Sequence, residues 1–348
     1  MRFAIWTYPW DVVDLGIDQV VADVRDRAGL NGINLATAYH AGRFFQPRSP
    51  RRKTYFPEDG TIYFQPDAQL WADRAIVPKV ADLVAERGDV LRALIQQRDQ
   101  TGLSVACWTV CLHNSRLGLL HPGACTRNAF GDPNYYSLCP SHPDVRAYAT
   151  TLVQDLTRNY RPEVVQLESP GFMAYHHGYH HETDGVGLTP EDDFLLSLCF
   201  CDACVQRASL AKVDAKAAQR TVRAWIEESA GRAVPAARWP DFARRGADMF
   251  RDHPEVEAYV LWRFEPVTSL VADVRAAADP ASRIDVIDDG WRSGSDPAAL
   301  ARFCDGILLC AYDRSPAAVG ADAAAVRRML PAQCRLGIGM RLFYPEMQ

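Results

Sequence analysis

Short apolar runs alternate with amphipathic stretches along almost the whole chain. The apolar runs, most of them ended by a proline, a glycine or a polar residue, predict buried strands over 2–8, 32–39, 103–110, 164–168, 283–289, 306–312 and 335–343. Apolar residues at helical spacing predict helices between these runs, over 17–28, 75–100, 144–160, 192–230, 255–278, 297–303 and 317–330. Gly88 should break the second of these helices, and Pro266 should kink or split the fifth.

This alternation has no internal repeat and no clear linker, which predicts an α/β fold with a parallel sheet. Right-handed crossovers in this number favour a (β/α)8 TIM barrel over an open sheet. The 348 residues fit a single barrel domain, 1–348, with long loops over 40–75, 111–140 and 170–205. Only seven strands are predicted, the last close to Gln348. We therefore expect an eighth strand outside this chain or an incomplete barrel.

The stretch from Val164 to Cys204 concentrates the residues with chemical potential. Its apolar strand ends on Glu168, directly before Ser-Pro-Gly. Barrel enzymes keep their catalytic groups at the C-terminal ends of strands, so Glu168 is the candidate acid/base residue. A carboxylate that pairs with an arginine, or that caps the following turn, is the alternative.

Three cysteines at the spacing Cys199-x-Cys201-x-x-Cys204 suit thiolates that converge on one ion. Zinc prefers four tetrahedral ligands, and Cys139, in the loop before a predicted helix, is the best candidate for the fourth. A site with four thiolates is closed, so this zinc would be structural. The alternative is a group of buried free cysteines.

These motifs resemble the β-galactosidases of glycoside hydrolase family 42. The resemblance rests on Cys139-Pro-Ser-x-Pro with Arg146, the acid that ends the fourth strand, Cys199-Phe-Cys201-Asp-Ala-Cys204, and Trp262-Arg-Phe. It covers roughly residues 135–290 and implies a (β/α)8 barrel, zinc on the four matching cysteines, Glu168 as general acid/base and retaining hydrolysis. The chain departs from the family in having Leu167 where the family has asparagine, and no glutamate within the predicted seventh strand.

Hydrolysis of a glycoside requires a second carboxylate across the sugar. Glu346, after the seventh strand, is our first candidate, and Asp288, at the end of the fifth, is the second. Asp289 and Asp313 are further candidates, although Asp288-Asp289-Gly is also a typical turn sequence.

Other polar and aromatic residues at strand ends should line the same face and bind substrate. Tyr39, His40 and Arg43 leave the second strand toward this face. Aromatic rings that can stack on sugars, and imidazoles that can bind hydroxyls, complete the set: Trp108, Trp291, Tyr312, His176 and His177. His180, His181 and Glu182 follow, but glycines around them favour a loop over a second metal site.

The composition of the chain limits the classes of partner that we expect. A net charge of −5 gives no reason to expect nucleic acid or an anionic membrane, and no apolar run reaches the ~20 residues that cross a bilayer. Ten cysteines without a signal-peptide pattern indicate thiols or metal ligands in a cytoplasmic protein. Whether a homo-oligomer forms is left open.

The sequence thus predicts a zinc-containing, glycoside hydrolase-like enzyme that acts on a carbohydrate or glycoside by carboxylate acid/base chemistry. Two alternatives stay open. One is a non-catalytic barrel that only binds carbohydrate, and the other is a metalloenzyme that uses the cluster from His176 to Glu182.

Overall fold

The computed structural model describes residues 1–177, 182–185, 187–242, 245–312 and 315–341. Seven parallel strands form its centre, in the spatial order of the sequence. They are β1 (Ala4–Thr7), β2 (Gly32–Tyr39), β7 (Ser104–Val110), β10 (Val164–Glu168), β11 (Arg283–Asp288), β12 (Gly306–Cys310) and β13 (Arg335–Gly339). All seven predicted strands are confirmed, most of them a little shorter than predicted.

Short strands extend the sheet beside the end of β2. There β5 (Thr61–Ile62) pairs antiparallel with β2, and β6 (Lys79–Val80) pairs parallel with β5. An irregularity in the β2–β7 pairing lies at Thr37, whose hydroxyl contacts the Trp108 carbonyl and the Thr109 hydroxyl. Two small antiparallel pairs lie in the loops: β3 (Phe44–Phe45) with β4 (Thr54–Tyr55), and β8 (Cys125–Arg127) with β9 (Pro133–Leu138).

Helices connect the parallel strands, as in a (β/α) barrel. Within the described residues these are α1 (Pro9–Leu15), α2 (Ile17–Val21) with a π-helical continuation (Ala22–Arg27), α3 (Ala68–Trp71), α4 (Asp82–Arg87), α5 (Val90–Thr101), α6 (Ser115–Leu120), α7 (Pro143–Tyr160), α8 (Pro190–Ser197), α9 (Asp202–Leu210), α10 (Ala215–Ala230), α11 (Pro254–Trp262), α12 (Phe264–Ala277), α13 (Pro297–Leu300) and α14 (Pro316–Met329). Gly88, at a φ of 85°, separates α4 from α5. The split predicted near Pro266 is present, but it lies at Arg263, between the end of α11 and the start of α12.

The barrel is open between its first and last strands. No pairing joins β1 to β13 in the part of the chain that the structure describes. A cavity of about 650 Å³ lies between them, lined by residues of both strands and by the interior side chains Asn34, Gln166 and Asp285. Trp6 reaches Gly339 at one end of the gap, where a Cβ on the glycine would meet the indole ring at 2.5 Å. Seven parallel strands and an unpaired gap between the first and the last, among the described residues, agree with the predicted strand count.

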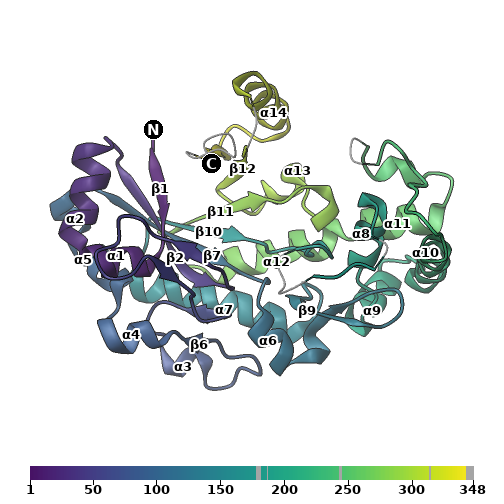
Figure 1. Cartoon of the computed structure of the whole chain (residues 1–348), viewed down its shortest axis with the longest axis horizontal. Helices are drawn as coiled ribbons and strands as arrows, with labels where there is room; N and C mark the ends of the chain where they lie inside the picture. The colour runs from purple at the N-terminus through teal and green to yellow at the C-terminus, as the bar shows by residue number, and fades with distance from the viewer. Residues whose placement is uncertain (178–181, 186, 243–244, 313–314, 342–348) are drawn as a thin grey trace.

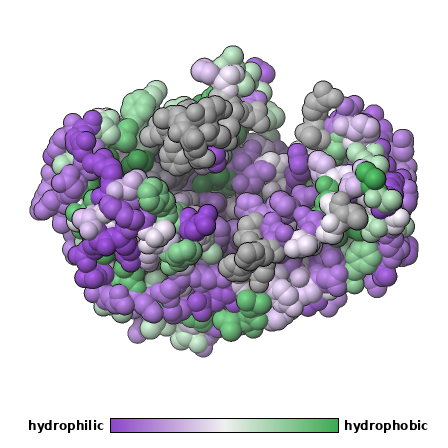
Figure 2. All heavy atoms as spheres, viewed as in Figure 1, coloured by the Kyte–Doolittle hydropathy of each residue, from purple (hydrophilic) through white to green (hydrophobic). Residues whose placement is uncertain are grey.

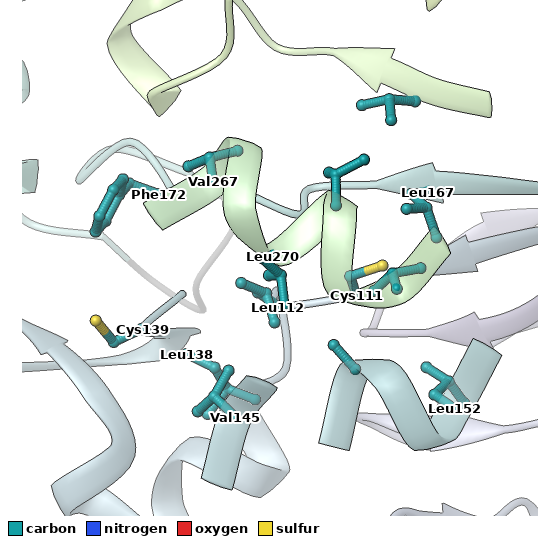
Figure 3. Packing of buried hydrophobic residues seen from close by; sticks show 14 of the residues in the cluster. Cys111, Leu112, Leu138, Cys139, Val145, Leu152, Leu167, Phe172, Val267 and Leu270 are labelled. Carbon is teal, nitrogen blue, oxygen red and sulfur yellow. The ribbon is translucent and has the colours of Figure 1, made fainter. Parts of the chain in front are cut away.

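The main apolar core lies between the sheet and its helices. Figure 3 shows part of it, where Val267 and Leu270 of α12 face the layer that contains Leu112, Leu138 and Val145. In Figure 1, α7 runs below the sheet, and α8 to α11 gather in a lobe at the right, far from β1. Polar residues predominate on the face shown in Figure 2, with smaller apolar patches between them. Among the described helices, none has the length and apolar character needed to cross a bilayer.

Candidate active site and cysteine cluster

Glu168 ends β10 on the inner face of the barrel. Successive side chains of a strand point to opposite faces, so Gln166 and Glu168 share one face, while Val165 and Leu167 pack into the outer core. Gln166 accepts a hydrogen bond from the indole of Trp6 at 3.2 Å, inside the barrel. Trp108, on the neighbouring strand β7, donates its indole N–H to Oε2 of Glu168.

The chain turns sharply after Glu168. Ser169 adopts a left-handed φ of 50°, which is uncommon for a residue with a Cβ, and its side chain is buried. Gly171 lies so close to the Ser293 carbonyl that a Cβ would approach that oxygen to 2.4 Å. The Ser-Pro-Gly sequence therefore lets this loop pack against the segment after β11.

Asp289 is the second carboxyl group of the site. The register pairs Gln166 with Asp285, so the inner face of β11 carries Asp285 and Ile287 and continues to Asp289. Asp288 points the other way, accepting hydrogen bonds from the Gly290 N–H at 3.0 Å and the Ser295 hydroxyl at 2.6 Å. Of the two carboxylates that the sequence put forward as partners of Glu168, Asp288 thus holds a turn, and Glu346 lies outside the described residues.

The pKa values of both inner carboxyl groups are raised, that of Asp289 partly by the charge of Glu168. Burial raises the pKa of Glu168, and the Trp108 hydrogen bond opposes this rise. The pKa of Asp289 is raised to about 7, first by loss of solvation and then by the charges of Glu168 and Asp288, while the Ser169 N–H opposes the rise. Asp289 nevertheless keeps a solvent-exposed surface.

Aromatic rings continue from Glu168 toward the start of the chain. The ring of Tyr39 lies 5.5 Å from that of Trp108, and Tyr8 lies 5.3 Å from Trp108 and 5.2 Å from Tyr39. The Tyr8 and Tyr39 hydroxyls are 3.3 Å apart. Tyr39 and Trp108, both predicted to bind substrate, therefore belong to one wall beside the carboxyl pair.

Imidazole rings extend this wall further. His40 stacks on Tyr39 at 4.9 Å and on His113 at 3.8 Å, and His177 approaches His113 at 5.1 Å. Burial lowers the pKa of all three, that of His40 to about 4, so they are neutral at pH 7. His113 is buried, and its Nε2 has no hydrogen-bond partner among the described residues. His113 is not among the predicted substrate ligands, although its position three residues after the end of β7 is one at which such ligands are expected.

Other predicted substrate ligands lie apart from this wall. Arg43 is exposed. Trp291 packs on Phe194 at 5.0 Å and on Phe242. His176 is largely exposed beside Glu182 and Asp184, at the rim of a separate cavity of about 330 Å³. Tyr312 stays near the carboxyl pair, because the charge of Glu168 helps to raise its pKa, after burial and Cys310. His180 and His181 lie outside the described residues.

The four predicted cysteine ligands lie close together, although they come from two separate segments of the chain. Cys139 follows β9, Cys199 and Cys201 precede α9, and Cys204 lies in its first turn. The sulfur of Cys139 lies 3.4 Å from that of Cys204, 3.5 Å from Cys201 and 3.9 Å from Cys199. All four are buried, and their sulfur atoms lie within 4.8 Å of one another.

This arrangement can bind a metal ion. Disulfide bonds require about 2.05 Å between sulfurs, far less than observed. Four sulfurs at ~2.3 Å from a tetrahedral zinc lie about 3.8 Å apart, which is close to the observed separations. Among the described residues, no other group of three or more histidines, cysteines and carboxylates is placed to share an ion.

Comparisons with known proteins place the fold. No protein-family model matches the sequence, and no curated protein matches it. A β-galactosidase from Bacillus circulans sp. alkalophilus is similar in structure, with a TM-score of 0.53 and 12% identity over 94% of this chain and 43% of that chain. The PgaB (BpsB) glycoside hydrolase domain from Bordetella bronchiseptica has a TM-score of 0.49 and 15% identity, over 94% and 81%. An α-L-fucosidase isoenzyme 2 from Paenibacillus thiaminolyticus has a TM-score of 0.46 and 13% identity, over 100% and 47%.

The chain thus spans less than half the length of the β-galactosidase and fucosidase structures that it matches. The similarity to the β-galactosidase concerns the fold, since the identity is only 12%. It agrees with the family resemblance of the cysteine and strand-end motifs. The chain has the α/β barrel fold of glycoside hydrolases and resembles the β-galactosidase barrels.

Proposed function

We propose that this protein is a glycoside hydrolase in which Glu168 and Asp289 are the two reacting carboxyl groups. The single observation that supports this most is their placement at the ends of adjacent strands, Glu168 as the last residue of β10 and Asp289 directly after β11, where the charge of Glu168 raises the pKa of Asp289. Glycoside hydrolysis requires such a pair, one group to protonate the leaving oxygen and one to act on the opposite side of the sugar. The barrel fold shared with a β-galactosidase supports the same reaction class.

The surroundings of the two groups divide the roles between them. Trp108 donates a hydrogen bond to Glu168, which favours its ionised form. Asp289, with a pKa of about 7, then holds the proton near neutral pH. In this mechanism Asp289 protonates the leaving group, and the Glu168 carboxylate attacks the sugar or activates water. This reverses the role that the sequence indicated for Glu168.

The substrate is a carbohydrate that lies along the wall from Trp108 to His113. Tyr39 and Trp108 offer ring faces on which sugars stack, next to the carboxyl pair. His40 is neutral at pH 7, so one nitrogen donates and the other accepts a hydrogen bond from sugar hydroxyls.

The metal held by the four cysteines is zinc in a structural role. The sulfur separations and the all-thiolate donor set favour this ion, and four protein ligands leave no position for substrate. The cysteines would hold the segment between β10 and α10 against the loop that follows β9.

Turnover of a panel of aryl glycosides tests the proposal. Asp289→Asn and Glu168→Gln should each lower kcat roughly 100- to 10,000-fold, the usual contribution of a positioned acid or base. Asp288→Asn is the matched control, because it removes the same charge one residue away but on the outer face. Equal losses in Asp288→Asn and Asp289→Asn would contradict the assignment.

Azide rescue separates the two roles. With a small residue at the nucleophile, azide attacks the sugar directly and gives a glycosyl azide of inverted configuration. With a small residue at the acid/base, azide replaces water in the second step and gives a retained product. We expect the inverted product from Glu168→Gly and the retained product from Asp289→Gly if the enzyme is retaining.

A barrel that binds carbohydrate without cleaving it is the second candidate. The observation that favours it is β13, whose residues Arg335–Gly339 include no carboxylate. Binding of oligosaccharides by calorimetry, without turnover of any member of the panel, would support this alternative.

A further inference from the structure

Arg263 is a buried arginine whose guanidinium has no hydrogen-bond partner among the residues that the structure describes. It lies between α11 and α12, and only 1% of its surface is exposed. Its guanidinium lies over the rings of Phe172 at 4.5 Å and Phe194 at 5.4 Å. None of its three guanidinium nitrogens has a hydrogen-bond partner among the described residues, and no carboxylate there forms an ion pair with it.

Such a group is costly to bury. An arginine remains charged in proteins, and an uncompensated buried charge costs several kcal/mol. Cation–π contacts with two rings contribute about 2 kcal/mol when desolvated and offset only part of that cost. A compensating negative charge is therefore expected close to Arg263.

The cysteine cluster is the group that approaches this arginine. Tyr259, one helical turn before Arg263, donates its hydroxyl to the Cys199 carbonyl, and its ring stacks on Phe200 at 4.8 Å. The same face of α11 thus holds the cysteine loop. Burial lowers the pKa of Arg263, and this effect is opposed first by Tyr259 and then by the charges of Cys199, Cys204 and Cys139.

We propose that Arg263 is the counter-charge of the metal–thiolate site. Four thiolates and one Zn²⁺ carry a net charge of −4 + 2 = −2, in an interior where charges interact strongly. Arg263 neutralises part of this charge from behind the ligands, and the metal site in turn stabilises the buried guanidinium. The inference rests on the proposed zinc and names a positioning residue for it, without any role in the hydrolysis.

Zinc affinity measured by chelator competition tests this role. In the full-length protein loaded with zinc, Arg263→Met should bind zinc roughly 10- to 100-fold more weakly than the wild type, as is usual when a group behind the ligands is removed. Arg263→Lys keeps the charge and should lose less zinc affinity than Arg263→Gln. If Arg263→Met does not fold, the comparison between these two variants tests the inference instead. Arg275→Met, also on α12 but bonded to the Ser282 carbonyl, is the control and should leave the affinity unchanged.

Thermal unfolding adds a readout that a merely structural arginine would not change in this way. Arg263→Met should lower the Tm of the zinc-loaded protein but leave the Tm of the chelator-treated protein equal to or above that of the wild type, because the unpaired charge is gone. Unchanged zinc affinity in Arg263→Met, or an equal loss of Tm with and without zinc, would overturn the inference. A purified wild-type protein that contains and binds no zinc would instead overturn the zinc proposal on which the inference rests.

Discussion

The carboxyl pair and the cysteine cluster are both built from side chains that can ionise, but the two sites differ in how far the protein encloses them. All four cysteines are buried, and they contact one another and the backbone around them. Asp289 keeps an exposed surface, and Glu168 is only partly covered. The sulfur atoms of the four cysteines lie against one another inside the molecule, whereas both carboxyl groups keep part of their surface open to solvent.

The difference follows from where the two sites lie in the barrel. The carboxyl pair is at the C-terminal ends of β10 and β11, the edge at which barrel enzymes keep their functional groups. The cysteines connect the loop after β9 to the start of α9, outside the strands, where closure strengthens the packing of a long loop. Burial therefore has different consequences at the two sites. It raises the pKa of the carboxyl groups, whereas it removes the four cysteine side chains from solvent.

The largest expected effect on stability concerns the closed site. Cys204→Ser removes one ligand from the cluster, so the loop should lose its metal and the Tm should fall by roughly 10 °C, which corresponds to several kcal/mol for a chain of this size. Differential scanning calorimetry with zinc determination measures both. The KM of the remaining folded enzyme should stay close to that of the wild type. A protein with unchanged Tm and no zinc would contradict the structural role.

A pH dependence should distinguish the open site. Because the pKa of Asp289 is about 7 in the folded protein and about 3.9 in an unfolded chain, the folded state binds the extra proton between these values. The free energy of unfolding should thus fall as the pH rises from about 4 to about 7, and kcat should fall above pH 7 as the acid ionises. Urea unfolding and kcat at pH 5 and pH 8 measure these trends.

Asp289→Asn should remove that contribution to the pH dependence of stability, leaving it more stable than the wild type at pH 8. The cysteine variants should keep the wild-type slope. The same slope in Asp289→Asn as in the wild type would show that another group is responsible.

A smaller effect is expected from Trp108, which lies on β7 beside Glu168. Trp108→Phe keeps the ring face but removes the N–H bonded to Glu168, so the pKa of Glu168 should rise further. We expect the acidic limb of the pH–rate profile to move to higher pH and kcat to fall roughly tenfold, the equivalent of one hydrogen bond to a charged group. Trp291→Phe, on the outer aromatic cluster, is the control.

The smallest effect should come from His176. Its imidazole is largely exposed, and its ion pairs with Glu182 and Asp184 are at the surface. Surface pairs contribute 0 to about 1 kcal/mol, so His176→Ala should change stability by no more than about 1 kcal/mol and kcat/KM by less than about twofold. A large loss of activity together with loss of a second metal would instead support the metalloenzyme alternative.

Local patterns in the sequence determined the strands, the break between α11 and α12, and the identity of the four cysteines. Apolar runs that end on a turn identify buried strands, and Cys-x-Cys-x-x-Cys brings three sulfurs together within one loop and one helical turn. Cys139 could be predicted as the fourth ligand because zinc prefers four ligands and the family resemblance includes this cysteine. Glu168 could be selected because it is the residue on which an apolar strand ends.

Only the tertiary structure decided between Asp288 and Asp289, because two adjacent carboxylates look alike in a sequence until the strand register assigns their faces. The same holds for His113, which gains its meaning from rings that arrive from β2 and from the loop after β10. Arg263 is the strongest case. A sequence shows an arginine in an apolar helix, but only the packed structure shows that its charge is buried beside a cluster of thiols.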